Sequence, residues 1–204
     1  MQDNFYEKFG KRLFDLTVSF AGLVVLSPVF LVITLLIKLT DKGPVFFKQT
    51  RMGECFKPFM LIKFRSMVVN ADKIGLAITT KEDPRITGIG RFLRKTKLDE
   101  LPQLFNVLKG EMSFVGPRPE VAKYVELFRD EYREILKVKP GITDFATIEF
   151  RDEEGILNKY DKPDDGYCRE ILPRKIELYK KYIKEKSFLT DVKLILLTLR
   201  EIVR

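Results

Sequence analysis

The chain has 204 residues, a formal net charge of +8 and no histidine. Its length holds one globular domain and a membrane segment but hardly two independent hydrophobic cores. The charge indicates an anionic partner such as nucleic acid, an anionic membrane surface or a phosphorylated substrate. Without histidine, acid and base catalysis must use carboxylates, lysines or tyrosines. Cys55 and Cys168 form no CxxC pattern, which argues against a disulfide framework or zinc knuckle and favours a reducing, cytosolic environment.

The first predicted element is the uncharged apolar segment 16–37. As one continuous helix it would be about 33 Å long, enough to cross the hydrocarbon core of a bilayer. It exceeds the roughly 7–15 apolar residues of a signal peptide, and no small-residue cleavage site follows it. A spanning helix is the simplest interpretation of this composition.

Two features oppose simple crossing. Basic residues flank both ends of the segment, so the positive-inside rule draws both ends to the cytoplasm. In the middle, Pro28 lacks a backbone donor and leaves the carbonyl of Val24 without its helical partner, while Ser27 can hydrogen-bond back to a nearby carbonyl. These features favour a re-entrant helix-break-helix. Proline kinks also occur in spanning helices, so the residues by themselves leave both topologies open.

The rest of the chain has a mixed, charged composition. Segments 44–49 and 59–64 predict short strands, because they are rich in aromatic and β-branched residues and are separated by turn residues. Segments 97–108 and 121–136 predict helices from their apolar spacing. A last amphipathic helix is predicted near 189–203, with a pattern more typical of core packing than of a membrane surface.

The chemically suggestive stretch is 91–120, where Asp99-Glu100 lies between clusters of lysine and arginine. Neither a Walker loop nor a GxGxxG motif is present. Adjacent residues do not share a helix face, so the two carboxylates should point in different directions. Such a pair is usually a solvated charge pair, but without histidine a carboxylate nucleophile with a divalent cation is a natural way to attack phosphorus. Arg118 stands between two prolines, which suits either a phosphate-binding guanidinium or a surface turn.

Ordered motifs along the whole chain resemble the bacterial sugar transferase family in its smallest form. These are the monotopic phosphoglycosyl transferases that start glycan assembly on polyprenyl phosphate. The matching motifs are Lys11-Arg12-Leu13-Phe14-Asp15, Ser27-Pro28, 43–49 with Arg51 and Gly53, Lys63-Phe64-Arg65-Ser66-Met67, Asp83-Pro84-Arg85-Ile86-Thr87, 98–104, 106–113, 115–119 and 139–143.

The resemblance implies an α+β fold in two parts. Residues 1–40 would form a re-entrant membrane helix, broken at Ser27-Pro28, with its N-terminal flank. Residues 41–204 would form a mostly helical cytosolic catalytic domain with short strands and interfacial amphipathic helices, the C-terminal helix among them. The protein would be monotopic, at the cytoplasmic face of the inner membrane.

The resemblance also implies a two-step reaction. Asp99 would attack the sugar-bearing phosphate of a UDP-sugar, release UMP and hold the phosphosugar covalently until undecaprenyl (polyprenyl) phosphate takes it. The lipid product would begin synthesis of a glycoconjugate such as lipopolysaccharide, capsule, exopolysaccharide or a glycoprotein glycan. Asp99 and Glu100 are the implied candidates for catalysis and for binding Mg²⁺, and whether Glu100 helps to place the metal or accepts a proton from the lipid phosphate stays open. The other implied phosphate- or substrate-binding residues are Arg118, Arg94, Lys63, Arg65, Gln103 and Pro117.

The expected partners are a UDP-sugar, polyprenyl phosphate and inner-membrane phospholipid, and a homodimer is left open. Nucleic acid is not expected, since no recognition motif appears. Segment 144–154 departs from the sequence Gly-Trp-Ala-Gln-Val-Asn-Gly-Arg that many members of the family have after Pro-Gly-Ile-Thr, so no specific sugar is carried over. Two alternatives remain: a non-catalytic, membrane-tethered basic module that binds anionic lipid or nucleic acid, and a soluble enzyme whose apolar segment is a core helix.

Overall fold

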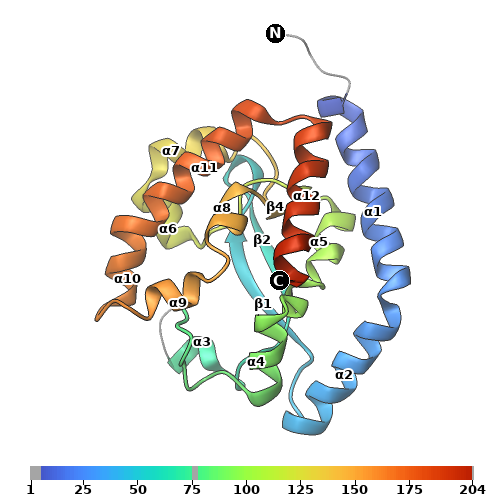
Figure 1. Cartoon of the computed structure of the whole chain (residues 1–204), viewed down its shortest axis with the longest axis vertical. Coiled ribbons are helices and arrows are strands. Elements are labelled where there is room, and N and C mark those ends of the chain that lie inside the picture. The colour runs from blue at the N-terminus through green and yellow to red at the C-terminus, as the bar shows by residue number, and fades with distance from the viewer. Residues whose placement is uncertain (1–5, 75–77, 204) are drawn as a thin grey trace.

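The computed structural model describes residues 6–74 and 78–203, so residues 1–5 of the expected N-terminal flank lie outside it (Figure 1). The first half of the chain contains η1 (Tyr6–Gly10), α1 (Lys11–Val25), α2 (Ser27–Asp41), β1 (Phe46–Met52), η2 (Glu54–Phe56), β2 (Pro58–Phe64), α3 (Ala71–Ile74), α4 (Gly88–Lys95) and η3 (Leu98–Glu100). The second half contains α5 (Gln103–Lys109), β3 (Ser113–Val115), α6 (Ala122–Leu127), α7 (Arg129–Ile135), β4 (Gly141–Thr143), α8 (Phe145–Glu149), α9 (Glu153–Leu157), α10 (Pro163–Gly166), η4 (Tyr167–Ile171), α11 (Leu172–Glu185) and α12 (Phe188–Val203). This mixture, mostly helical, confirms the α+β class.

Helices α1 and α2 form a pair bent by 60°. At the break Leu26 has φ −87° and ψ 1°, and Pro28 lies in the first turn of α2. Ser27 Oγ donates to the Val24 carbonyl at 2.8 Å, in place of the amide that Pro28 lacks. The predicted break and its hydrogen bond are confirmed. Within the described residues no single helix is long and apolar enough to cross a membrane, whereas this bent pair meets both criteria together.

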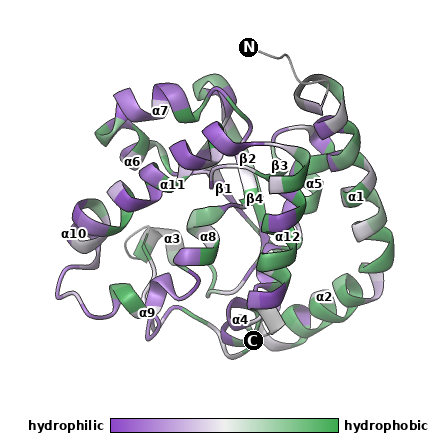
Figure 2. Ribbon diagram, turned by 45° about the horizontal axis from the view of Figure 1, so that its top comes forward, coloured by the Kyte–Doolittle hydropathy of each residue, from purple (hydrophilic) through white to green (hydrophobic). Residues whose placement is uncertain are grey.

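The bent pair has an inner and an outer face. On the inner face α1 packs against α5, and Ile33 and Ile37 of α2 are buried with Phe64 and Leu93. Both helices are strongly apolar (Figure 2). On the outer face, a row of large apolar side chains is exposed: Leu13, Phe20, Val24, Val25, Leu31, Val32, Leu35, Leu36 and Leu39.

The two predicted strands are confirmed as β1 and β2, an antiparallel pair in which Gln49 lies opposite Leu61. A second pair, β3 and β4, is parallel and was not predicted, because three-residue strands are too short to show an alternating pattern. This pair positions the site, since β3 leads into Arg118 and β4 leads into Asp144.

The two predicted helices of the middle region are each divided. Segment 97–108 begins as the 3₁₀ turn η3, and α5 starts only after Pro102, which has no amide hydrogen to continue the turn. Segment 121–136 is broken at Phe128, with φ −123° and ψ 43°, into α6 and α7. Both halves keep their apolar faces in the core, which is why the periodicity appeared continuous.

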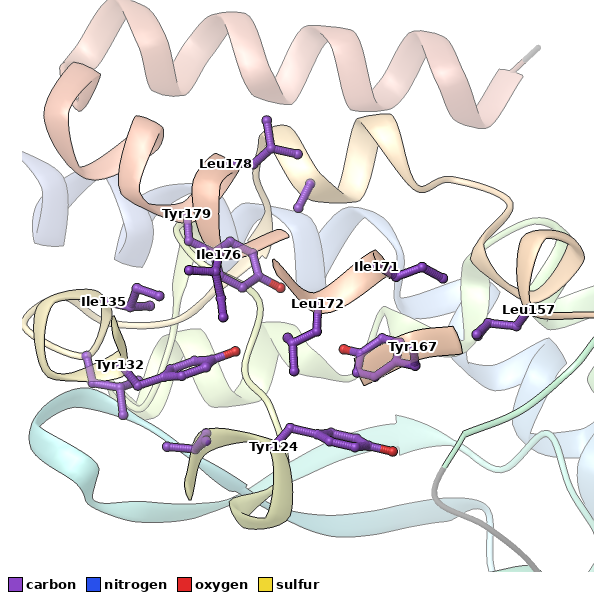
Figure 3. Packing of buried hydrophobic residues seen from close by; sticks show 13 residues of the cluster. Tyr124, Tyr132, Ile135, Leu157, Tyr167, Ile171, Leu172, Ile176, Leu178 and Tyr179 are labelled. Carbon is purple, nitrogen blue, oxygen red and sulfur yellow. The ribbon is translucent and has the colours of Figure 1, made fainter. Parts of the chain in front are cut away.

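The largest core cluster lies between α6, α7, η4 and α11, where Tyr124, Tyr132, Tyr167 and Tyr179 surround Leu172 (Figure 3). Helix α12 packs elsewhere. It buries Leu194 in a smaller cluster, and among its described side chains it exposes four large apolar ones, Phe188, Leu189, Leu196 and Leu199. The predicted amphipathic helix is therefore confirmed, with a core-packing side and an exposed apolar side.

Candidate active site

The Asp99-Glu100 pair lies in the short turn η3, between α4 and α5. Lys97, just before it, has the left-handed φ of 57°, and its carbonyl accepts from the Glu100 amide at 3.2 Å. The tight turn sends the two carboxylates to different partners, as expected for adjacent residues.

Glu100 accepts hydrogen bonds from two cations that come from distant parts of the chain. Lys63 Nζ at the end of β2 donates to Oε1 at 2.8 Å. Arg118 Nη1 donates to Oε2 at 3.1 Å, and its Nη2 donates to Oε1. Although burial alone would raise the pKa of Glu100, Arg118 and Lys63 hold that pKa well below its usual value. Glu100 is therefore ionised and a weak base.

Asp99 has the opposite environment. It is 5% exposed, and its Oδ1 has no hydrogen-bond partner among the described residues. Burial raises the pKa of its carboxyl above the usual value, and the charge of Lys63 opposes that rise. A buried carboxylate oxygen without a donor is costly, which is typical of an atom that takes part in chemistry or meets a ligand.

The loop that carries Arg118 is held by backbone contacts of two glycines. Gly141 N donates to the Pro117 carbonyl at 2.9 Å, and a Cβ on Gly141 would lie 2.1 Å from Gly116 N. Only glycine permits this close approach. The Arg118 amide donates to Asp144 Oδ2 at 3.3 Å. The observed contact of Pro117 is therefore its backbone carbonyl, which helps to hold the loop.

The other predicted residues surround this centre in different ways. Arg94 on α4 pairs with Glu154 on α9, and its charge acts on Asp99. Gln103 is 1% exposed, and its Nε2 has no hydrogen-bond partner in the described residues. Arg65 is buried beside Gly43, where a Cβ would lie 2.2 Å from its Nη1. Hydrogen bonds bring Glu100, Lys63 and Arg118 together, and charge interactions connect Asp99 with Lys63, Glu100 and Arg94. The binding roles of all the predicted residues stay predictions.

Sequence reasoning missed two acidic residues of the divergent segment. Glu154 binds Arg94 through Nε at 2.9 Å and also through Nη2. Asp144 caps α8 by accepting from the Thr147 amide at 2.7 Å and also accepts from Arg118. The cap follows a recognisable pattern, an aspartate just before a helix. The pairing of Arg94 with Glu154 has no local signal, because 60 residues separate the partners.

The carboxylates of the turn suit a magnesium ion. Among the described residues, no group of three or more histidine, cysteine, aspartate or glutamate side chains is placed to hold a metal. Mg²⁺ commonly binds through one or two carboxylates and completes its shell with substrate phosphates and water. The unpartnered Oδ1 of Asp99, next to Glu100, fits that mode of binding.

Comparison with known proteins identifies the family. The model of the bacterial sugar transferase family matches residues 6–204. A UDP-glucose:undecaprenyl-phosphate glucose-1-phosphate transferase of Klebsiella pneumoniae is 45% identical over 92% of this chain and 39% of its own length. The exopolysaccharide production protein PSS of Rhizobium leguminosarum is 42% identical over 91% of this chain and 90% of its own length.

A third relative is a UDP-N-acetylgalactosamine-undecaprenyl-phosphate N-acetylgalactosaminephosphotransferase of Aeromonas hydrophila, 36% identical over 95% of this chain and 44% of its own length. The chain thus spans less than half the length of two of these three relatives. The names of the relatives include glucose and N-acetylgalactosamine, so they indicate no single sugar. On the family match and these identities, the chain belongs to the bacterial sugar transferase family.

Proposed function

We propose that the chain is a phosphoglycosyl transferase that moves a sugar-1-phosphate from a UDP-sugar to undecaprenyl phosphate and releases UMP. The observation that carries the proposal is the contrast within the pair: Glu100 is bound by two cations, whereas Asp99 is buried beside them with a carboxylate oxygen that has no partner in the described part of the chain. This arrangement offers one nucleophile and a cationic setting for phosphate. The names of the relatives support the substrate class.

In the first step an Asp99 carboxylate oxygen attacks the sugar-bearing phosphorus of the UDP-sugar. The new bond joins that oxygen to phosphorus, and the bond to the bridging oxygen breaks, so that UMP leaves with the electron pair. In the second step an oxygen of polyprenyl phosphate attacks the same phosphorus. Its bond to Asp99 breaks, which regenerates the carboxylate and gives the polyprenyl-diphosphate sugar.

Lys63 and Arg118 provide the cationic side of the site. Both donate hydrogen bonds to Glu100, which follows Asp99 directly in the turn η3. Their charges offset the repulsion between an anionic nucleophile and an anionic phosphate. A magnesium ion held by Asp99 and Glu100 would supply the same charge compensation for the diphosphate.

Of the two roles left open for Glu100, the proposal takes that of charge and metal partner. Its pKa lies well below the usual value because of Arg118 and Lys63, which makes it a poor acceptor for a proton. A polyprenyl phosphate near neutral pH also needs little help, since the second pKa of a phosphate monoester is about 6.

The proposal places α1 and α2 in the membrane as a re-entrant pair, with residues 41–204 as the catalytic domain on the cytoplasmic face of the inner membrane. The 60° bend and the row of exposed apolar side chains support this placement. The exposed Leu189, Leu196 and Leu199 of α12 suit contact with the membrane surface. Such a placement brings a membrane lipid phosphate to a site that also faces a soluble nucleotide sugar.

The test is UMP release from a panel of UDP-sugars, with and without undecaprenyl phosphate and Mg²⁺. The wild type should release UMP with one or a few sugars, and chelation should stop the release. Asp99→Asn should lower turnover about 1,000-fold or more, because the amide is not a nucleophile. Undiminished turnover of Asp99→Asn, or no UMP release by the wild type with any sugar, would show the proposal to be wrong.

A further inference from the structure

We infer that the first turns of α1 are a positioning clamp for the active site, in which Asp15 sets the strand that leads to Arg118 while Arg12 holds the helix that follows Asp99-Glu100. The inference rests on the proposed function. It assigns Asp15, Lys11 and Arg12 a role in the geometry of catalysis. Among the described residues, no hydrogen bond or ion pair joins any of these three to Asp99 or Glu100. We define these three residues as the α1 clamp.

Asp15 is a buried carboxylate, 2% exposed, on the inner side of α1. A single oxygen, Oδ1, accepts from Ser113 Oγ at 3.1 Å and from the Phe114 amide at 3.0 Å. Both donors belong to β3, which has only three residues and leads directly through Gly116-Pro117 to Arg118. Because loss of a buried acceptor leaves its donors unsatisfied, Asp15 fixes the start of β3 strongly.

Lys11 holds the other end of the same strand. Its Nζ donates to the Val115 carbonyl at 3.0 Å and pairs with the buried Asp191 of α12 at 2.5 Å. It also donates to the hydroxyl of Tyr182 in α11, which lies 3.0 Å from the same Val115 carbonyl. Strand β3 is therefore fixed at both ends by residues four positions apart on α1, one helical turn.

Arg12 connects the same turn to the other half of the site. Its Nη1 donates to the Val107 carbonyl at 2.6 Å and its Nη2 to the Leu108 carbonyl at 2.9 Å. These carbonyls belong to the C-terminal end of α5, where carbonyls run out of intrahelical donors, and the Val107 carbonyl also accepts from the capping Gly110 amide at 3.0 Å. Helix α5 begins three residues after Glu100, so its position determines that of the carboxylate pair.

The α1 clamp therefore contacts both chain segments whose separation sets the distance between Arg118 and Asp99-Glu100. The same helix, α1, is the first member of the bent pair that we place in the membrane. A small displacement of reacting groups is costly in catalysis, and errors of about 1 Å can lower rates about 100-fold. Loss of the clamp should accordingly reduce kcat while substrate binding largely persists.

The decisive comparison is Asp15→Asn with Asp15→Ala in the full chain. Asparagine keeps the Oδ1 acceptor for Ser113 and Phe114, whereas alanine removes it. For UMP release, Asp15→Ala should lower kcat about 10-fold to 100-fold with KM for the UDP-sugar changed less than about threefold, and Asp15→Asn should restore most of kcat. Thr17→Ala on the exposed side of α1 is the control, since Thr17 bonds only within its own helix in the described contacts.

Folded Asp15→Ala with wild-type kcat would overturn the inference. So would Asp15→Asn as impaired as Asp15→Ala, because the negative charge rather than the acceptor would then matter. If Asp15→Ala does not fold, Ser113→Ala, which removes one of the two donors, should show a smaller loss of kcat of the same kind, and an unchanged kcat would again overturn it.

Amide hydrogen exchange separates failure of the clamp from failure of the proposed function. The weakened variant, Asp15→Ala or Ser113→Ala, should exchange faster over residues 113–119 than the wild type, with little change over the β1–β2 pair. Faster exchange without UMP release by any form would keep the clamp and refute the proposed function. Unchanged exchange over 113–119 would refute the clamp, whatever the activity.

Discussion

The guanidinium of Arg118 binds both carboxylate oxygens of Glu100, and the neighbouring Asp99 keeps an oxygen that has no donor among the described residues. Glu100 thus binds both cations, and Asp99 is left buried beside them. The bidentate geometry also fixes the guanidinium plane, which a lysine could not do.

Removing the charge of Glu100 should damage both stability and turnover. Glu100→Gln leaves Lys63 and Arg118 as partly buried cations without their carboxylate. Removing one partner of a buried ion pair costs about 3–5 kcal/mol of folding stability. Because the side chains of Glu100, Lys63 and Arg118 are partly exposed, we expect a loss at or below the lower end of that range. Chemical denaturation measures the loss. The control Glu126→Gln, in an exposed pair with Arg129, should change stability by less than about 0.5 kcal/mol.

Neutralising Asp99 should stabilise the fold at neutral pH. The pKa of Asp99 is higher in the folded than in the unfolded chain because of burial, so the ionised form is disfavoured by folding. This loss of folding stability is absent below the pKa of Asp99 in the unfolded chain, about 3.9. It develops as the pH rises above that value and is complete once the pH has passed the pKa of Asp99 in the folded chain. Asp99→Asn should therefore have a higher Tm than the wild type at pH 7, and the difference should shrink toward pH 4. An equal or lower Tm at pH 7 would contradict this account of Asp99.

The fall of activity at acid pH should also come from the raised pKa of Asp99. In the proposed first step Asp99 must be ionised to attack phosphorus, so kcat should fall as the pH decreases through its raised pKa. Glu100, whose pKa is low, should not contribute to that limb. The fall of kcat is measured as a pH profile of UMP release at saturating substrate concentrations. A flat profile down to about pH 4 would indicate that Asp99 has an ordinary pKa.

Glu154 should compete with substrate phosphate for Arg94. Arg94 is bound by Glu154, and a diphosphate that contacts Arg94 would compete with this carboxylate for the guanidinium. Glu154→Gln should lower KM for the UDP-sugar about 2-fold to 5-fold, with kcat little changed. Glu149→Gln, which affects the exposed pair with Arg174, is the matched control. An increase in KM would mean that Glu154 holds Arg94 in its productive position.

The break at Ser27-Pro28 should determine the topology. In a background of Cys55→Ser and Cys168→Ser, single cysteines at Gln2 and Lys48 should be labelled from the cytoplasmic side in inverted vesicles. Adding Pro28→Leu restores a helical donor to the segment and favours a continuous, spanning helix. The two positions should then be labelled from opposite sides in a fraction of the molecules. Labelling from opposite sides without Pro28→Leu would refute the re-entrant placement.

The features predicted from sequence were those with local signals. The proline break, its hydrogen bond from Ser27 to Val24 and the strands β1 and β2 each follow from a few neighbouring residues. The Asp99-Glu100 pair and Arg118 became candidates because they share one motif-rich stretch, and their roles stay predictions. The different environments of the two carboxylates agree with their adjacent positions, which face different ways in a turn.

What the sequence did not predict depends on partners that are distant in the chain. Strands β3 and β4 are too short for a periodic pattern, although they position Arg118 and Asp144. The pairing of Arg94 with Glu154 joins residues 60 positions apart, and no local rule selects that partner. The break at Phe128 was missed because both sides keep the same apolar spacing. Such features are set by tertiary packing rather than by local propensity.

The most direct test of the central claim is detection of the covalent intermediate. Wild-type protein is mixed with Mg²⁺ and a UDP-sugar that supports UMP release, without polyprenyl phosphate, then quenched and digested for mass spectrometry. We expect a phosphosugar on the peptide that contains Asp99, with UMP released in a matching amount. Adding polyprenyl phosphate before the quench should remove the adduct. An adduct on another residue, or turnover by a wild type that never forms an adduct, would contradict the role of Asp99 as nucleophile.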